Sequence, residues 1–210
     1  MRYMSVVAGL FLIVIGVLAV GAFIAWPRPK PVPAASANSS GSINEIALGS
    51  PTAKVSIIEY GDFGCPTCKA WHDAGILGQV RKQYGDKVRF VWRDFPVITD
   101  QSPKAAEAAR CANDQGKFWE YHDLLYARQP ALDVKSLKDY AAQLGLDAAK
   151  FNPCLDSGRH KAEVDSNLRD AMSRGFRGTP TFLINDMPVV GGPSLGYLRQ
   201  LIDPLLASGS

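Results

Sequence analysis

Residues 55–68 read VSIIEYGDFGCPTC, an apolar run of strand character followed by two cysteines that are two residues apart. These cysteines, Cys65 and Cys68, stand where a helical pattern begins and continues towards Tyr84. Unpaired backbone N–H groups and the positive end of the helix dipole stabilise a thiolate at a helix N-terminus. Pro66 suits this position, because its missing N–H had no partner within the helix. Since a thiolate is the species that attacks disulfides, we predict a redox dithiol. Cys65 is the expected nucleophile, and Cys68, one turn further in and more buried, is the expected resolving thiol.

Two other interpretations of the pair remain. Cys65, Cys68 and His72 are spaced i, i+3 and i+7, so all three could share one helix face and hold a metal. A closed zinc site needs a fourth ligand, however, and the sequence has no second Cys-x-x-Cys and no His pair to offer one. A purely structural disulfide within so short a loop gives little entropic stabilisation. We therefore expect neither a metal nor another cofactor.

The N-terminal part of the chain is expected to lie outside the folded domain. From Ser5 to Trp26 no side chain is charged and nearly every residue is apolar, which suits a helix crossing a bilayer core of about 30 Å. We predict a transmembrane signal anchor over residues 1–26 and a Pro/Ala/Ser-rich linker over residues 27–44. Cleavage near Ala35-Ser36-Ala37 is the alternative. The cysteines favour an oxidising compartment, so we expect a single-pass protein of the cell membrane with its domain on the extracytoplasmic side.

Residues 45–207 are long enough for one domain with a substantial core. The formal net charge of +3 is small and the basic residues do not cluster, which gives no support to nucleic-acid binding. The patterns predict a strand at 55–60, a helix at 65–84, a second strand at 87–95, a long helical region at 103–174, a β-hairpin at 181–190 and a closing helix at 194–206. Breaks in the helical region are expected at Gln115-Gly116, Gln129-Pro130, Gly145 and Asn152-Pro153. This order predicts an α/β protein with a thioredoxin fold and a helical subdomain inserted at about residues 102–175.

Three segments resemble the DsbA family of thiol–disulfide oxidoreductases. EYGDFGCPTC at residues 59–68 looks like the active-site region of that family, and FWEYHD at 118–123 is similar to a segment of its helical insertion. GTPTFLIN at 178–185 looks like its cis-proline strand. The resemblance covers about residues 43–206 and is closest to membrane-anchored or secreted members, including the BdbD type. The dipeptide between the cysteines is Pro-Thr, in place of the Pro-His of enteric DsbA.

The resemblance implies roles for three further residues. Glu59 matches a buried acid that accepts a proton near Cys68, and burial would raise the pKa of its carboxyl group. The alternative is a strand-end carboxylate that faces solvent or pairs with Arg93. Pro180 matches the cis-proline, whose loop faces the dithiol, and Thr179 before it would offer its backbone to an extended substrate. A trans proline in a turn is the alternative.

Cys111 and Cys154 fall in different parts of the helical region and have no CxxC partner. Because the number of cysteines is even and the compartment is expected to be oxidising, we predict a structural disulfide between them. The competing interpretation is a second redox pair that tunes the first.

The leading predicted function is a protein disulfide oxidoreductase that forms disulfides in exported proteins. The first alternative function is a disulfide reductase or isomerase that uses the same dithiol. The second belongs to another functional class and is a thioredoxin-fold chaperone or metal carrier. The expected partners are unfolded or partly folded exported proteins. The sequence has no second dithiol domain and no quinone or flavin motif, so we also expect a membrane redox partner of the DsbB or VKOR type.

Overall fold

The computed structural model describes residues 45–208. Among these residues, no helix combines the length and the apolar character needed to cross a membrane. The expected anchor at residues 1–26 and linker at residues 27–44 lie outside the described residues.

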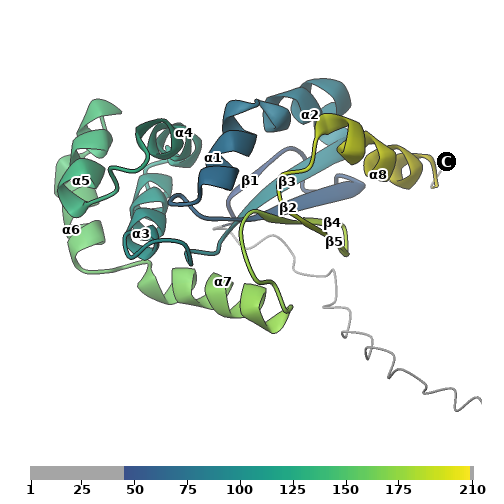
Figure 1. Ribbon diagram of the computed structural model, residues 1–210. Helices are drawn as coiled ribbons and strands as arrows, with labels where there is room; N and C mark the ends of the chain where they lie inside the picture. Colours follow the sequence, from purple (N-terminus) through teal and green to yellow (C-terminus); the bar gives the residue numbers. More distant parts are fainter. Residues whose placement is uncertain (1–44, 209–210) are drawn as a thin grey trace, which may run out of the picture. The chain divides into compact units, whose positions relative to one another are not determined.

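A five-stranded mixed sheet organises the domain in the order β1-β3-β2-β4-β5 (Figure 1). The central strands β2 and β3 are parallel, and every other neighbouring pair is antiparallel. Strand β2 is rich in apolar residues because elements cover both faces of the sheet there. The strands span Ala47–Leu48 (β1), Val55–Gly61 (β2), Val88–Asp94 (β3), Thr181–Ile184 (β4) and Met187–Val190 (β5).

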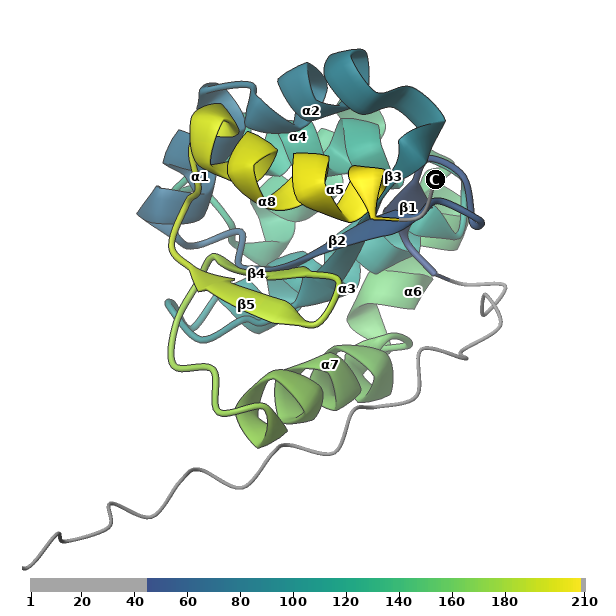
Figure 2. The same ribbon diagram turned by 90° about the vertical axis from the view of Figure 1, so that its right-hand side faces the viewer.

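Helices cover both faces of the sheet. Helix α2 (Ile76–Tyr84) and helix α8 (Leu195–Ala207) lie on one face, and helix α7 (Lys161–Ser173) lies on the other (Figure 2). Helix α1 (Pro66–Asp73) precedes α2, and a short 3-10 helix (Gly85–Lys87) follows it. Apolar residues of β2, β3 and β4 pack against α1, α2 and α8 in one buried cluster. The thioredoxin fold predicted from the sequence is therefore confirmed.

The inserted helices lie at one end of the sheet (Figure 1). They are α3 (Ser102–Asn113), α4 (Phe118–Arg128), α5 (Val134–Gln143) and α6 (Ala148–Asp156), and α7 leads back to the sheet. Their buried cluster also contains Phe63, Cys65, Cys68 and Trp92. The start of the dithiol helix thus lies at the seam between the insertion and the thioredoxin core.

Two expected helix boundaries were wrong. The predicted helix over 65–84 is interrupted at Gly75, whose φ of +65° is the left-handed conformation that glycine adopts at little cost. The expected break at Asn152-Pro153 is absent, because Pro153 lies inside α6 and removes only its own hydrogen bond to the first turn of that helix. The chain turns instead at Gly158, with φ of +66°.

Candidate active site

The turn that leads into the dithiol is held by the carboxylate of Asp62, which is 1% exposed. Its Oδ1 accepts a hydrogen bond from the N–H of Gly64 at 2.7 Å. Its Oδ2 accepts two more, from the N–H groups of Val97 and Ile98, each at 2.8 Å. Gly64 itself has no room for a side chain, because a Cβ atom there would lie 2.5 Å from Ser102 Oγ. Asp62 therefore fixes the dithiol turn to the loop between β3 and α3, a role that the sequence did not reveal.

Cys65 caps the N-terminus of α1, as its place in the sequence predicted. Its backbone is extended, and its Sγ accepts a hydrogen bond from the N–H of Cys68 at 3.4 Å. The carbonyl oxygen of Thr179 lies 3.2 Å from the same sulfur and accepts a hydrogen bond from the protonated thiol. Cys65 is 3% exposed and Cys68 is fully buried, so the order of burial is as expected. Cys65 is nevertheless less exposed than expected, because the Thr179–Pro180 loop lies against its sulfur.

The two thiols of the pair have opposite pKa shifts. Hydrogen bonds from the Cys68 thiol and from the backbone N–H groups at the start of α1 lower the pKa of Cys65 to about 5, although burial opposes this. Burial raises the pKa of Cys68, and the hydrogen bond to Cys65 and the charges of Glu59 and Cys65 raise it further. At neutral pH the reduced pair therefore consists of a Cys65 thiolate and a Cys68 thiol.

A pH titration of the reduced protein should show the Cys65 thiolate directly. We expect its ultraviolet absorbance to appear with a midpoint near pH 5, compared with 9.0 for an ordinary cysteine. Because the folded pKa is lowered, the thiolate stabilises the reduced fold fully above the unfolded pKa, and this stabilisation is lost as the pH falls through about 5. The Cys65→Ser variant is the control and should lack the transition. A midpoint close to that of an ordinary cysteine would contradict the assignment.

Glu59 is buried in β2 with only 2% of its surface exposed. Burial, and then the negative charge of Cys65, raises the pKa of its carboxyl group to about 8. The alternative of a solvent-facing carboxylate paired with Arg93 is wrong, since Arg93 pairs with Glu45 at 2.9 Å. The charge of Glu59 contributes to the raised pKa of Cys68. A carboxyl group with a pKa of about 8 can gain and lose a proton near neutral pH.

The Thr179–Pro180 peptide bond is cis, and its loop faces the dithiol as the resemblance implied. The side chain of Gln129 lies on the same turn, where its Nε2 donates hydrogen bonds to the carbonyl oxygens of Phe63 and, at 3.3 Å, of Cys65. The sequence interpretation treated Gln129-Pro130 only as a helix break. No local pattern could have indicated this contact, because Gln129 and Cys65 are 64 residues apart.

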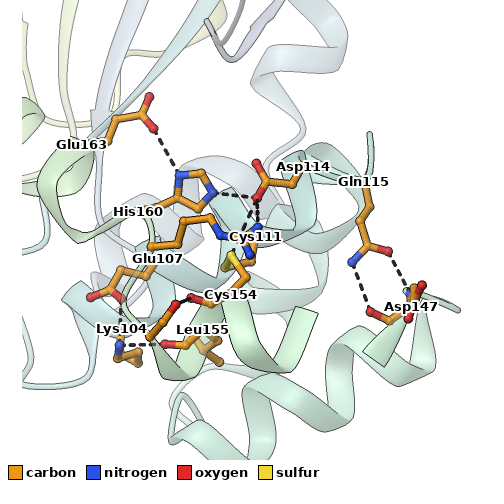
Figure 3. Close-up of a disulfide and its surroundings, with 12 residues drawn as sticks. Lys104, Glu107, Cys111, Asp114, Gln115, Asp147, Cys154, Leu155, His160 and Glu163 are labelled. Atoms are coloured by element: carbon orange, nitrogen blue, oxygen red, sulfur yellow. Dashed lines mark hydrogen bonds and ion pairs between the residues drawn. A yellow bond between two sulfur atoms is a disulfide. The ribbon is translucent and has the colours of Figure 1, made fainter. Parts of the chain in front are cut away.

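Cys111 of α3 and Cys154 of α6 are joined by a disulfide, the pairing expected from the sequence (Figure 3). Each cysteine is 1% exposed. The side chains of Asp114 and His160 lie beside the bond and are joined by a hydrogen bond of 2.9 Å. The disulfide thus connects two inserted helices through cysteines that are 43 residues apart. In the chain-entropy model a loop of this length gives about 4 kcal/mol of stability.

Mild reduction should distinguish the two cysteine pairs. Because the lowered pKa of Cys65 stabilises the reduced form of the dithiol, we expect a monothiol reductant to open Cys65–Cys68 first and to leave Cys111–Cys154 intact. Alkylation followed by peptide mass mapping would identify the thiols released. The Cys65→Ser/Cys68→Ser double variant is the control and should release none under the same conditions. Early release of Cys111 would favour the second-redox-pair interpretation.

The alternative metal ligands of the dithiol helix do not converge. The described residues contain no cluster of Cys65, Cys68 and His72. The ring of His72 instead hydrogen-bonds to Asp123 at 3.1 Å and to Asp73 at 3.3 Å. His72, His122 and Asp123 do bring three possible ligand atoms within 4.8 Å of one another. Hydrogen bonds of both rings to Asp123 already account for that arrangement.

Residues 41–204 match the family model described as thioredoxin. Among solved structures, the chain is similar to a thioredoxin-like oxidoreductase from Silicibacter pomeroyi, with 27% identity and a TM-score of 0.71 over 80% of this chain and 95% of that one. It also shares the fold of BdbD from Bacillus subtilis, with 23% identity and a TM-score of 0.71 over 78% of this chain and 94% of that one.

Curated relatives include the Na+/H+ antiporter NhaA 1 of Salinispora arenicola, which is 41% identical over 142 residues. The match covers 65% of this chain and 21% of that protein. The chain thus spans about a fifth of the length of the curated relatives it matches. Ion transport by those proteins is therefore not carried over to this chain.

Proposed function

Since the chain belongs to the thioredoxin family and is a protein disulfide oxidoreductase with a DsbA-like fold, we propose that it works as an oxidase that forms disulfides in exported proteins. The observation that carries the direction is the lowered pKa of Cys65, about 5. Stabilising this thiolate stabilises the reduced form, and a stable reduced form makes the Cys65–Cys68 disulfide a strong oxidant. The backbone N–H of Thr67, in the dipeptide between the cysteines, contributes to the lowering of the Cys65 pKa.

The reaction transfers two electrons from the substrate to the dithiol. A substrate thiolate attacks Cys65 Sγ, so that a mixed disulfide forms and the Cys65–Cys68 bond breaks. Cys68 leaves as a thiolate and takes a proton, which Glu59 would supply. The second substrate thiolate then attacks the substrate sulfur, forms the substrate disulfide and releases Cys65 as a thiolate.

The substrates are proposed to be unfolded or partly folded exported proteins. Thr179 would offer its backbone to an extended substrate chain beside Cys65. Such a backbone contact recognises a strand-like segment rather than a particular sequence. The apolar segment within residues 1–26 would anchor the protein in the cell membrane, with the domain on the extracytoplasmic side. A membrane protein of the DsbB or VKOR type would accept the electrons from the reduced dithiol.

The reduction potential of the Cys65–Cys68 pair tests the direction. Equilibration with glutathione, followed by quantification of the free thiols, should give a value closer to that of DsbA, about −120 mV, than to that of thioredoxin, about −270 mV. The oxidised protein should also convert a dithiol peptide to its disulfide, and the Cys65→Ser variant should not. A potential close to that of thioredoxin would overturn the oxidase and favour a reductase.

A further inference from the structure

A cavity of about 250 Å³ connects the region of Glu59 with the surface of the domain. Polar residues from four elements line it, with Glu59 from β2, His72 from α1, Arg81 from α2, and His122, Asp123 and Tyr126 from α4. The side chain of Asp123 is 63% exposed, so this wall of the cavity meets solvent. Glu59 at the other wall is 2% exposed.

Two residues that line this cavity each carry a buried polar atom with no hydrogen-bond partner among the residues that the structure describes. These atoms are Nε2 of His122 and the hydroxyl oxygen of Tyr126. Their residues are 3% and 1% exposed. Buried polar groups in proteins are nearly always paired, and a cavity of this size holds several water molecules. Enclosed water between these two atoms and the cavity would satisfy both of them.

The other ring nitrogen of His122, Nδ1, contacts a solvent-exposed carboxylate. Its Nδ1 lies 2.8 Å from Oδ1 of Asp123, which also accepts a hydrogen bond from His72 at 3.1 Å. Burial lowers the pKa of His122, which keeps its ring neutral at physiological pH. A neutral imidazole holds one proton, so it can take a proton at one nitrogen and release the other proton from the second. His122 therefore lies between a buried and an exposed proton acceptor.

We propose that His122 relays protons between Glu59 and solvent, through water in this cavity on one side and Asp123 on the other. The inference rests on the proposed function, in which Cys68 gains a proton when the dithiol is reduced and loses it when the dithiol is reoxidised. During reoxidation the Cys68 proton passes to Glu59, a proton passes through water to Nε2 of His122, and the Nδ1 proton leaves to Asp123. During reduction of the dithiol the same proton transfers occur in the reverse order, from Asp123 through His122 and Glu59 to Cys68. Each turnover thus restores the starting tautomer of His122.

Reoxidation of the reduced full-length protein by oxidised glutathione separates the two relevant steps. In the first step the Cys65 thiolate attacks glutathione and no proton of Cys68 moves. In the second step Cys68 must lose its proton before it attacks Cys65 Sγ. Acid quenching and mass analysis would give both rates. We expect His122→Gln to leave the rate of the first step unchanged. It should slow the second step about 10- to 100-fold, an effect at or below the contribution that general acid–base catalysis usually makes to a rate. The solvent deuterium isotope effect on the second step should increase.

Two further variants control for an indirect effect of replacing a buried ring. Asp123→Asn changes an exposed side chain, keeps a hydrogen-bond acceptor for His122 and should also slow only the second step. His160→Gln removes another histidine paired with an aspartate, far from the dithiol in sequence and fold, and should change neither step. Added imidazole should restore the second step in His122→Ala, because the small base can enter the vacated space.

Unchanged second-step rates in both His122→Gln and Asp123→Asn would overturn the relay. A slower second step accompanied by a changed equilibrium constant with glutathione would also overturn it, since His122 would then act on the stability of the dithiol. Failure of the wild-type protein in the first step would instead contradict the proposed function, so the two failures are distinguishable.

Discussion

Replacing Cys65 with serine will abolish thiol–disulfide exchange, whereas replacing Cys68 with serine will leave a protein that reacts once and then stops. Cys65 carries the thiolate at neutral pH, because its pKa is lowered to about 5 while that of Cys68 is raised. Without Cys65 no sulfur at the helix terminus can form a mixed disulfide. Without Cys68 the mixed disulfide forms but has no internal thiol to resolve it. Peptide oxidation by the oxidised proteins, together with non-reducing gels of the reduced proteins incubated with a disulfide-containing substrate, would measure both effects.

The reciprocal pair of variants provides its own control. Cys68→Ser should accumulate covalent complexes that disappear on reduction, and Cys65→Ser should accumulate none. Residual exchange in Cys65→Ser at more than a small fraction of the wild-type rate would show that Cys68 can act as the nucleophile. Preferential alkylation of Cys68 in the reduced protein at acidic pH would lead to the same conclusion.

Replacing Arg110 with leucine will destabilise the fold by about 3–5 kcal/mol, the usual cost of leaving one partner of a buried ion pair unpaired. Asp94 at the end of β3 is fully buried, and its carboxylate accepts hydrogen bonds from Trp92 Nε1 at 2.8 Å and from Arg110 Nε at 2.5 Å. Asn167 of α7 donates to the same carboxylate at 3.2 Å. The leucine would leave this charge without its cation. Urea-induced unfolding followed by circular dichroism would give the change in the free energy of unfolding.

The double variant Asp94→Asn/Arg110→Leu removes the charge as well and should recover part of the lost stability. Lys135→Leu is the matched control, because its partner Asp139 and its own side chain lie at the surface, and unfolding should barely change. A free energy of unfolding that is the same for Arg110→Leu and Lys135→Leu would show that water reaches Asp94 and replaces the guanidinium.

Sequence reasoning succeeded where a local pattern determines the structure. The dithiol at a helix start, the hairpin around Asn185 and the pairing of Cys111 with Cys154 each depend on residue types at short spacings or on a small number of possible partners. Burial of Glu59 was implied by the resemblance to the DsbA family, while the strand pattern alone left a solvent-facing carboxylate open. The two-residue strand β1 was missed, since so short a segment shows no alternation.

The features that sequence reasoning missed around the dithiol depend on contacts between distant segments. Asp62 binds backbone groups of Val97 and Ile98, and Gln129 reaches the carbonyl oxygen of Cys65. Such contacts follow from how the insertion packs against the sheet, which no single helix or strand pattern specifies. His122 entered the sequence analysis only as part of the segment 118–123 that resembles the DsbA family, and its ring packs among aromatic side chains. That its Nε2 lacks a hydrogen-bond partner among the described residues can be recognised only from the three-dimensional structure.

The buried cluster shared by the insertion and the dithiol has a consequence for protein engineering. Cys65 and Cys68 pack with residues of α3, α4, α5 and α6, not with the cluster beneath α2 and α8. The insertion is therefore not a detachable module, and trimming the chain to a minimal thioredoxin would uncover the sulfurs. Swapping the insertion between related proteins would therefore also change the packing around the two sulfurs.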